Sequence, residues 1–509
     1  MSAGNEAASR PPGLGCPADG PACLVTRTGV RLRPDPSRTL SRLFVPGQET
    51  LIQGQSRATL VINRVLAMSE AEAERVLART MARFGGGYRD LARVFDHHFG
   101  LVAGGLGRGI RVSVARRQLI GAYFTQQYAL EAAALFNPSI VPHPDQDGCP
   151  PGAVRFVLSL RAVGEGHLSS IEFRTGLVGA DGTITVDEPG RFPDAGSRRE
   201  VDFDRALFRA KLAELGHDDE NADFLWSLLP PRFTGAEMDA ALAELARQHL
   251  LRGDCAPLVE GVRWMTASSY EVEFDPRLSL SERVLWPGGP ADSHGMEDAR
   301  FVRFTPEGGD AVYLATYSAY DGRRVASHLL KTRDFRTFAI SPLSGQSTRN
   351  KGLAIFPRPV GGRYAALSRW DRESNAIAYS DDGHRWDDAV NIQVPARPWD
   401  AVQLGNCGSP LETEAGWLVF THGVGPMREY AIGAILLDLA EPERLIGSLP
   451  EPLLIADETE RAGYVPDVVY SCGALRHGDT IVLPYGCADS SVRFATVDLP
   501  GLLRRLTHP

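Results

Sequence analysis

The C-terminal half of the chain alternates short apolar runs with polar turns, a pattern typical of β-strands. Four segments share one layout, in which a turn is followed by an apolar run with a polar tip: 311–317, 363–369, 416–422 and 479–485. Their second residues are separated by 52, 53 and 63 residues. A second apolar run follows each segment, at 325–330, 376–379, 431–437 and 492–497. We interpret the four segments as an internal repeat of paired strands.

A repeat of this length with several short strands predicts the blades of a β-propeller. The four repeats and the β-rich runs at 153–160 and 169–178 together make five blades. Equivalent positions on successive blades converge near the central channel. We therefore expect the four polar tips to meet at one mouth of that channel: Tyr317, Arg369, His422 and Tyr485. The main competing architecture is a β-sandwich with a helical domain.

Apolar residues at helical spacing occupy two other parts of the chain. Capping boxes at Ser69–Glu72 and Thr234–Glu237 mark helix starts in each of them. The predicted fold is mainly β: a disordered tail at 1–23, a mixed and α-helical domain at 24–128, and a five-bladed propeller at 129–509. A helical insertion at about 200–255 interrupts this propeller.

Composition narrows the class of protein. The 509 residues are 43% hydrophobic and 23% charged, with a net charge of −9, so nothing favours nucleic-acid or membrane binding. Seven scattered cysteines without CxxC spacing argue against a disulfide framework and a structural zinc site. The N-terminus lacks the apolar core of a signal peptide, and we expect a cytoplasmic protein that could form homo-oligomers.

The candidate chemistry centres on Glu297-Asp298-Ala299-Arg300, a charged cluster that runs into an apolar strand. Charges at such a position need partners, and an ion pair at a strand edge would be the ordinary explanation. The repeat favours a functional site over a simple ion pair, because it brings Asp298 towards basic residues at the entries and ends of other strands. These residues are Arg349, Lys351, Arg369 and His422. Such a basic group is suited to an oxyanion, and Asp298 becomes a candidate acid.

At these residues the chain resembles family 130 of the glycoside hydrolases, over roughly residues 130–509. The members are five-bladed propellers, mainly inverting phosphorylases of β-mannosides, together with some β-1,2-mannosidases. The most specific matches are Glu297-Asp298-Ala299-Arg300, Thr421-His422-Gly423-Val424 and Tyr485-Gly486-Cys487-Ala488-Asp489. The family's acidic motif usually carries proline where this chain has Ala299.

The resemblance implies a role for each matching residue. Asp298 would be the catalytic acid, and phosphate would be bound by Lys351, Arg369, His422 and Arg349. Sugar contacts would come from Asn137, Ser139, Arg174, Glu297, Arg300, Tyr317, Tyr430, Tyr485 and Asp489. No cofactor is expected, with inorganic phosphate as co-substrate, and the other partner would be a small carbohydrate.

The implied reaction is phosphorolysis of a β-mannoside, most simply a β-1,2-linked manno-oligosaccharide, to α-mannose 1-phosphate. Asp298 would deliver a proton to the leaving oxygen through a sugar hydroxyl, while phosphate attacks the opposite face of the ring. Two alternatives stay open. The first is a β-1,2-mannosidase on the same fold, and the second is a propeller that binds glycans without catalysis.

Overall fold

The computed structural model describes residues 24–47, 50–51, 55–105, 111–248 and 254–508. The tail predicted at 1–23 lies outside these residues. More of the described residues lie in strands than in helices, and nearly all strand pairs are antiparallel, which confirms the prediction of a mainly β protein.

The principal strands fall into five antiparallel groups, and within each group most strands pair with their neighbour in the chain. The first contains β6 (Ala134–Pro142), β7 (Val154–Val163), β8 (Ser169–Val178) and β9 (Ile184–Val186). The second contains β15 (Gly295–Phe304), β16 (Val312–Tyr320), β17 (Val325–Thr332) and β18 (Thr337–Pro342), extended by β13 (Tyr270–Glu273) and β10 (Ser197–Arg199). The pair Gly295–Ser169 joins these two groups into one eleven-stranded sheet, to which β14 (Val284–Leu285) also belongs.

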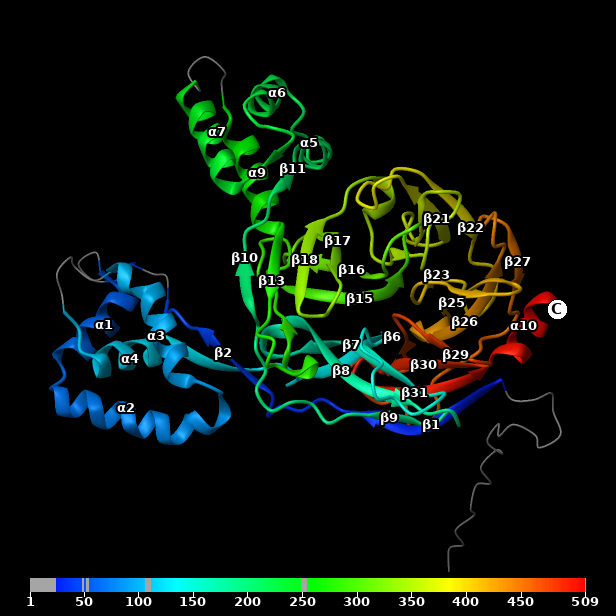
Figure 1. Cartoon of the computed structure of the whole chain (residues 1–509), viewed down its shortest axis with the longest axis horizontal. Coiled ribbons are helices and arrows are strands. Elements are labelled where there is room, and N and C mark those ends of the chain that lie inside the picture. The colour runs from blue at the N-terminus through cyan, green and yellow to red at the C-terminus, as the bar shows by residue number, and fades with distance from the viewer. Residues whose placement is uncertain (1–23, 48–49, 52–54, 106–110, 249–253, 509) are drawn as a thin grey trace, which may run out of the picture.

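The remaining groups follow in chain order around the rounded body of Figure 1. The third contains β19 (Ala354–Ile355), β20 (Tyr364–Ser368), β21 (Asn375–Ser380) and β22 (Ala389–Gln393). The fourth contains β23 (Gln403–Asn406), β24 (Leu411–Thr413), β25 (Gly416–Val424), β26 (Tyr430–Leu437) and β27 (Leu445–Ser448). The fifth contains β28 (Val469–Tyr470), β29 (Leu475–His477), β30 (Thr480–Cys487) and β31 (Ser491–Asp498).

The predicted repeat is confirmed at the level of its strands. The four first runs correspond to β16, β20, β25 and β30, and the four second runs to β17, β21, β26 and β31. In every case the two strands form an antiparallel pair.

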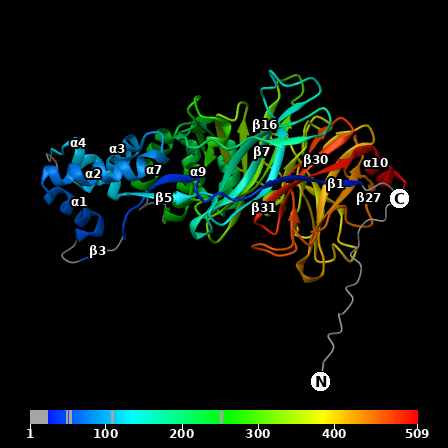
Figure 2. The same ribbon diagram turned by 90° about the horizontal axis from the view of Figure 1, so that it is seen from below.

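The fifth group is completed from the other end of the chain. Strand β1 (Val25–Leu32) pairs antiparallel with β31 and forms the edge of that sheet. Residues 25–32 lie in the range predicted for the N-terminal domain, but their hydrogen bonds place them in the C-terminal sheet. Figure 2 shows β1 running beside β31.

The hydrophobic core is divided among the gaps between successive groups. Separate clusters join the first group to the second, the second to the third, the third to the fourth, and the fourth to the fifth. A further cluster joins the fifth group back to the first, since Leu135 and Leu158 pack with Val482 and Phe494. Each sheet therefore buries both of its faces against its neighbours.

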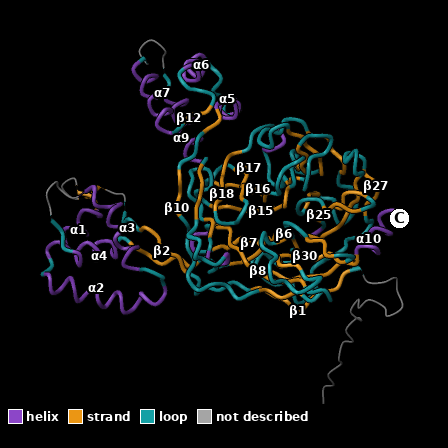
Figure 3. The backbone as a smooth tube through the Cα atoms, viewed as in Figure 1, coloured by secondary structure: helices purple, strands orange, loops and turns teal. Residues whose placement is uncertain are grey.

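Two helical parts stand outside the strand groups, as Figure 3 shows. Helices α1 (Arg57–Ala67), α2 (Glu70–Phe84), α3 (Leu91–Val102) and α4 (Val114–Tyr123) share an apolar core of their own. Strands β2 (Thr39–Leu43) and β5 (Thr125–Ala129) form an antiparallel pair, and Figure 3 shows β2 between these helices and the strand groups. In the described residues, no helix has the length and apolar character needed to span a membrane.

The second helical part contains α5 (Arg205–Glu214), α6 (Glu220–Ser227), α7 (Gly235–Arg247) and α9 (Ala256–Ser268), and β11 (Phe203–Asp204) pairs with β12 (Arg232–Phe233) between them. The capping box predicted at Thr234 and Glu237 starts α7. The helices continue to Ser268, past the predicted end near 255, because α9 packs its apolar face against α5 and α7. Helix α10 (Leu499–Thr507) ends the described chain.

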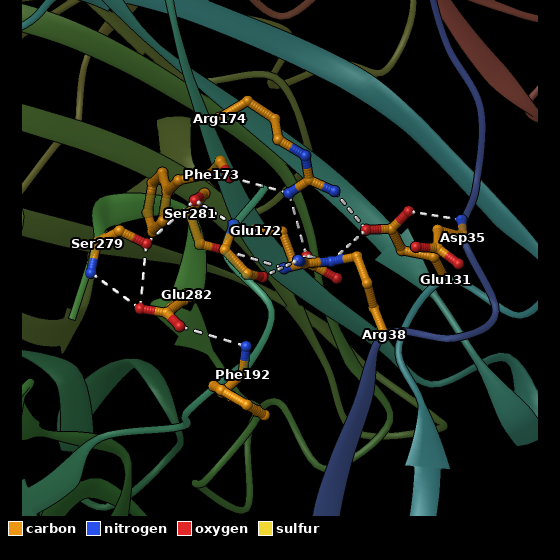
Figure 4. A network of polar contacts seen from close by, with 11 residues as sticks. Asp35, Arg38, Glu131, Glu172, Phe173, Arg174, Phe192, Ser279, Ser281 and Glu282 are labelled. Atoms are coloured by element: carbon orange, nitrogen blue, oxygen red, sulfur yellow. Dashed lines mark hydrogen bonds and ion pairs between the residues drawn. The ribbon is translucent and has the colours of Figure 1, made fainter. Parts of the chain in front are cut away.

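A buried network of four charges connects the N-terminal segment to β8 (Figure 4). Arg38 donates to Glu172 at 2.7 Å and lies 2.9 Å from Glu131. Arg174 contacts the same two carboxylates, and all four side chains are almost fully buried. Two cations thus balance two anions in a place that water does not reach.

Replacing Arg38 with methionine should therefore destabilise the protein. The change leaves two buried carboxylates with one arginine, and breaking a buried pair in this way costs about 3–5 kcal/mol. Urea denaturation of Arg38→Met measures the loss, with exposed Arg33→Met from the same segment as the control. A loss within about 0.5 kcal/mol, the ordinary range for surface changes, would contradict the structural role of this network.

Candidate active site

A pocket of about 230 Å³ opens where all five strand groups meet. Its lining residues come from the strand ends and connections on one face of the body: Phe136, Asn137, Arg161, Asp298, Lys351, Arg369, Gln403, His422, Arg428, Tyr430, Val468, Tyr470 and Asp489. Four of these side chains are permanent cations and two are carboxylic acids, so the pocket is strongly polar.

Two β-bulges place Asn137 and Asp298 in the pocket. From Phe136 to Ser139, β6 advances by three residues while its partner β7 advances by two. From Glu297 to Arg300, β15 likewise advances by three residues while β16 advances by two. Each bulge therefore contains one extra residue, and such bulges re-aim side chains next to active sites. Both residues have a left-handed backbone, with φ of 50° at Asn137 and 55° at Asp298.

The third such position is the turn between β30 and β31. Ala488 and Asp489 follow each other there with φ of 50° and 49°. Left-handed backbone is uncommon outside glycine and costs free energy that the surrounding structure must supply. Of the ten left-handed non-glycine residues in the described chain, four line this pocket: Asn137, Asp298, Arg428 and Asp489. Strained backbone therefore helps to shape the candidate site.

Arg300 holds the bulge of Asp298 in place. Its guanidinium donates to the carbonyl oxygens of Asp298 at 2.9 Å and Cys407 at 3.1 Å, and to the hydroxyl of Tyr470. Arg300 is itself buried behind the pocket wall. Its role in this structure is to connect β15 to the fourth and fifth groups.

Glu297 neutralises two of the cations around the pocket. Arg161 donates to one of its carboxylate oxygens at 2.6 Å, and Lys351 donates to the other. Arg161 also lies 3.6 Å from the carboxylate of Asp298. Burial raises the pKa of Asp298, but the charges of Lys351, Arg161, Arg300 and Arg369 together outweigh burial and hold that pKa below its usual value.

His422 and Arg369 form the opposite wall. Arg369 Nη1 lies 3.1 Å from His422 Nε2, and the His422 ring stacks on Tyr430. Burial, and then Arg369 and Arg300, lower the pKa of His422 well below its ordinary value. The histidine is therefore neutral near pH 7.

Several buried polar atoms around this pocket have no hydrogen-bond partner in the described protein. They are Asn137 Oδ1, Arg161 Nε, Arg369 Nε, His422 Nδ1 and both side-chain atoms of Asn406. Buried polar groups are nearly always satisfied, so a cluster of exceptions in one place needs an explanation. A polar ligand would supply the missing partners. Among the described residues, no group of three His, Cys, Asp or Glu side chains could hold a metal ion.

The structure brings together seven of the predicted site residues: Asn137, Asp298, Lys351, Arg369, His422, Tyr430 and Asp489. Glu297 and Arg300 contact this set from behind. Ser139 lies deeper and accepts a hydrogen bond from the backbone of Phe301. Arg349 is exposed and does not line the pocket.

Three other predicted contacts lie away from the pocket. Arg174 belongs to the buried network of Figure 4. Tyr317 donates to Asp292 at 3.3 Å, and Tyr485 donates to Glu460 at 2.7 Å. Both tyrosines sit inside strands and face the cores between sheets, because alternate residues of a strand face opposite sides. The predicted convergence therefore holds for Arg369 and His422 and is wrong for the two tyrosines.

The sequence reasoning missed six lining residues: Phe136, Arg161, Gln403, Arg428, Val468 and Tyr470. Arg161 and Arg428 matter most, because they add two cations. Arg161 directly follows the run predicted at 153–160, and the structure pairs it with Phe136, next to the Asn137 segment. No comparable signal marks Arg428 among the many arginines of the chain.

Comparison with known proteins identifies the family. Residues 275–507 match the family model of glycoside hydrolase family 130, described as beta-1,4-mannooligosaccharide phosphorylase. A beta-1,2-mannobiose phosphorylase of Listeria innocua is 32% identical over 262 residues, which is 49% of this chain and 72% of the relative. A 1,2-beta-oligomannan phosphorylase of Thermoanaerobacter sp. is 28% identical, over 48% of this chain and 83% of the relative.

The solved structure of the Listeria innocua beta-1,2-mannobiose phosphorylase with beta-1,2-mannobiose covers 74% of this chain and 92% of its own, at 24% identity and a TM-score of 0.42. The sequence relative of Listeria innocua, 32% identical over 72% of its own length, shows the family. The chain belongs to glycoside hydrolase family 130.

The second carboxylate of the pocket gives a measurable prediction. Burial, and then the charge of Asp298, raise the pKa of Asp489 to about 6. Replacing Asp298 with asparagine removes that negative charge, so the pKa of Asp489 should fall. Carboxyl ¹³C NMR titration measures it, with Asp187→Asn at the distant β9 strand as the control. An Asp489 pKa that stays near 6 in Asp298→Asn would show that the two carboxylates do not interact.

Proposed function

We propose that the protein is an inverting phosphorylase that cleaves β-mannosides with inorganic phosphate and releases α-mannose 1-phosphate. The observation that carries the proposal is the charge of the pocket, where Arg161, Lys351 and Arg369 surround Asp298. A mannoside is neutral and has no need of three cations. A phosphate dianion does, and guanidinium and ammonium groups are its usual partners.

We further propose that the five strand groups are the blades of a five-bladed propeller. Three observations support this: the groups follow each other in chain order, apolar clusters join each to the next, and a further cluster joins the last to the first. Strand β1 would close the ring by completing the fifth blade. In such a ring each blade would contribute to the central pocket, in agreement with its lining.

Asp298 would supply the proton to the leaving oxygen, by way of a sugar hydroxyl as the family resemblance implies. Its pKa lies below the ordinary value in the present arrangement, which is unfavourable for an acid. Phosphate bound between Lys351 and Arg369 would add negative charge beside Asp298 and raise that pKa. Phosphate binding would thus promote protonation of the acid that the reaction needs.

The relatives favour a manno-oligosaccharide substrate. The names of the Listeria and Thermoanaerobacter enzymes specify β-1,2 linkages. A third relative, from Ruminococcus albus, is a beta-1,4-mannooligosaccharide phosphorylase and is 33% identical over 37% of this chain. We propose the β-1,2 linkage on this basis.

Hydrolysis is the second candidate, and Asp489 is the observation that favours it. An inverting hydrolase needs a second carboxylate to activate water, and Asp489 lines the same pocket as Asp298. In the phosphorylase this base is unnecessary, because phosphate is the nucleophile. The two reactions differ in their need for phosphate.

Phosphate dependence tests the proposal. With β-1,2-mannobiose as substrate, sugar release should require phosphate, and the phosphorylated product should be α-mannose 1-phosphate. Asp298→Asn should lower turnover by about a hundredfold or more, which is the usual contribution of a general acid. Glu307→Gln, on the exposed turn after the same strand, serves as the control.

Two results would contradict the proposal. Equal release of mannose in phosphate-free buffer would identify a hydrolase. Unchanged turnover in Asp298→Asn would remove Asp298 from the chemistry.

A further inference from the structure

Two aromatic rings stand next to the mouth of the pocket. His167 and Tyr464 come from loops almost 300 positions apart in the chain, yet their ring centroids are 5.6 Å apart. Tyr464 is 65% exposed, although a ring of this size usually buries most of its surface. Neither residue lines the pocket itself.

The loop of Tyr464 is fixed to the turn that carries Asp489. The backbone nitrogen of Tyr464 donates to the hydroxyl of Ser490 at 2.8 Å, and that of Val465 donates to the carbonyl of Ala488 at 3.0 Å. These bonds flank Asp489 on both sides. The loop that carries Tyr464 is therefore anchored to the turn that carries Asp489.

Two hairpin turns on this face share an unusual backbone. In the turn between β7 and β8, Gly166 and His167 have φ of 67° and 57°. In the turn between β25 and β26, Met427 and Arg428 have φ of 58° and 62°. Paired left-handed residues define a type I′ turn, which strongly favours Asn-Gly. Met427-Arg428 is thus a strained choice of residues.

The positions of the two side chains in this turn suggest why the strained backbone is retained. Met427 is 98% exposed, whereas Arg428 lines the pocket. No ion-pair partner of Arg428 occurs among the described residues within 4.0 Å. Strained backbone that persists beside a binding site points to a side chain required there.

The size of the pocket limits what it can enclose. Its volume of about 230 Å³ lies below the range of roughly 300–1,000 Å³ that is typical of pockets for small molecules. One sugar ring and a phosphate would fill most of this volume. Further sugar units of an oligosaccharide would have to leave through the mouth, beside the two loops.

We propose that the His167–Tyr464 ring pair and Arg428 bind the sugar units that extend out of the pocket, and that they make the enzyme prefer longer acceptor chains. This proposal rests on the proposed phosphorylase function. Aromatic faces pack against the apolar C–H faces of sugar rings, and a guanidinium donates several hydrogen bonds to sugar hydroxyls.

The test runs the reaction in the synthetic direction with α-mannose 1-phosphate. The acceptors are mannose, β-1,2-mannobiose and β-1,2-mannotriose, and phosphate release is measured. In the wild type, the acceptor KM should fall as the chain lengthens. Tyr464→Ala should raise the KM for mannotriose by about tenfold, with the KM for mannose 1-phosphate unchanged. Tyr464→Trp, which keeps an aromatic face, should restore most of the preference.

Arg428→Gly and Met427→Gly form a matched pair in one turn. Both replace a left-handed residue with glycine and should raise Tm similarly, because glycine tolerates this backbone. Only Arg428→Gly should reduce the preference for longer acceptors. An equal effect of the two variants on that preference would remove Arg428 from the proposal.

Other outcomes distinguish a failure of the proposed sugar-binding site from a failure of the proposed phosphorylase function. A wild-type KM that does not depend on chain length would overturn it, and so would a Tyr464→Ala variant with a raised KM for mannose 1-phosphate. If no acceptor releases phosphate, the phosphorylase function fails. Calorimetric titration with mannotriose then tests whether the His167–Tyr464 ring pair binds sugar. An affinity for mannotriose that is unchanged in Tyr464→Ala would exclude the ring pair as a sugar site.

Discussion

Repulsion between cations is the constraint on which the site depends. Arg161, Lys351 and Arg369 line one small pocket, where each loses part of its hydration, and the exposed Arg428 lies at the edge of this pocket. Glu297 binds two of them, and the ionised Asp298 lies beside Arg161. Arg369 has a neutral histidine as its neighbour rather than a carboxylate. The protein alone therefore leaves positive charge in the pocket, and an anionic substrate would balance it.

The same charges determine the chemistry of Asp298. An acid among cations loses its proton readily, so the pocket lowers the pKa of the group that we assign as proton donor. Phosphate reverses this effect when it binds, since it neutralises the cations that depress the pKa. Binding of the nucleophile and protonation of the acid are then linked, which suits a reaction that needs both at once. The bulge on β15, held by Arg300, keeps Asp298 at this position.

The internal repeat explains which strands and which site residues could be predicted from the sequence. The spacing of the apolar runs correctly located the four strand pairs, and it placed Arg369 and His422 at one face because both lie at the mouth ends of equivalent strands. Tyr317 and Tyr485 share that spacing, but their side chains face the cores between sheets. A pattern that counts residues cannot resolve which face of a strand a side chain takes. Arg174 was misassigned because its buried partner Glu131 lies 43 positions away in the chain.

The phosphate KM of a lysine variant tests the account most directly. Lys351→Met removes one charge-assisted hydrogen bond, worth about 1.5–3 kcal/mol, and should raise the KM for phosphate by roughly tenfold or more. The KM for β-1,2-mannobiose should change much less. Lys331→Met, an exposed lysine outside this pocket, should leave both values unchanged. A phosphate KM that is the same in Lys351→Met and the wild type would contradict the assignment of the cationic pocket to phosphate.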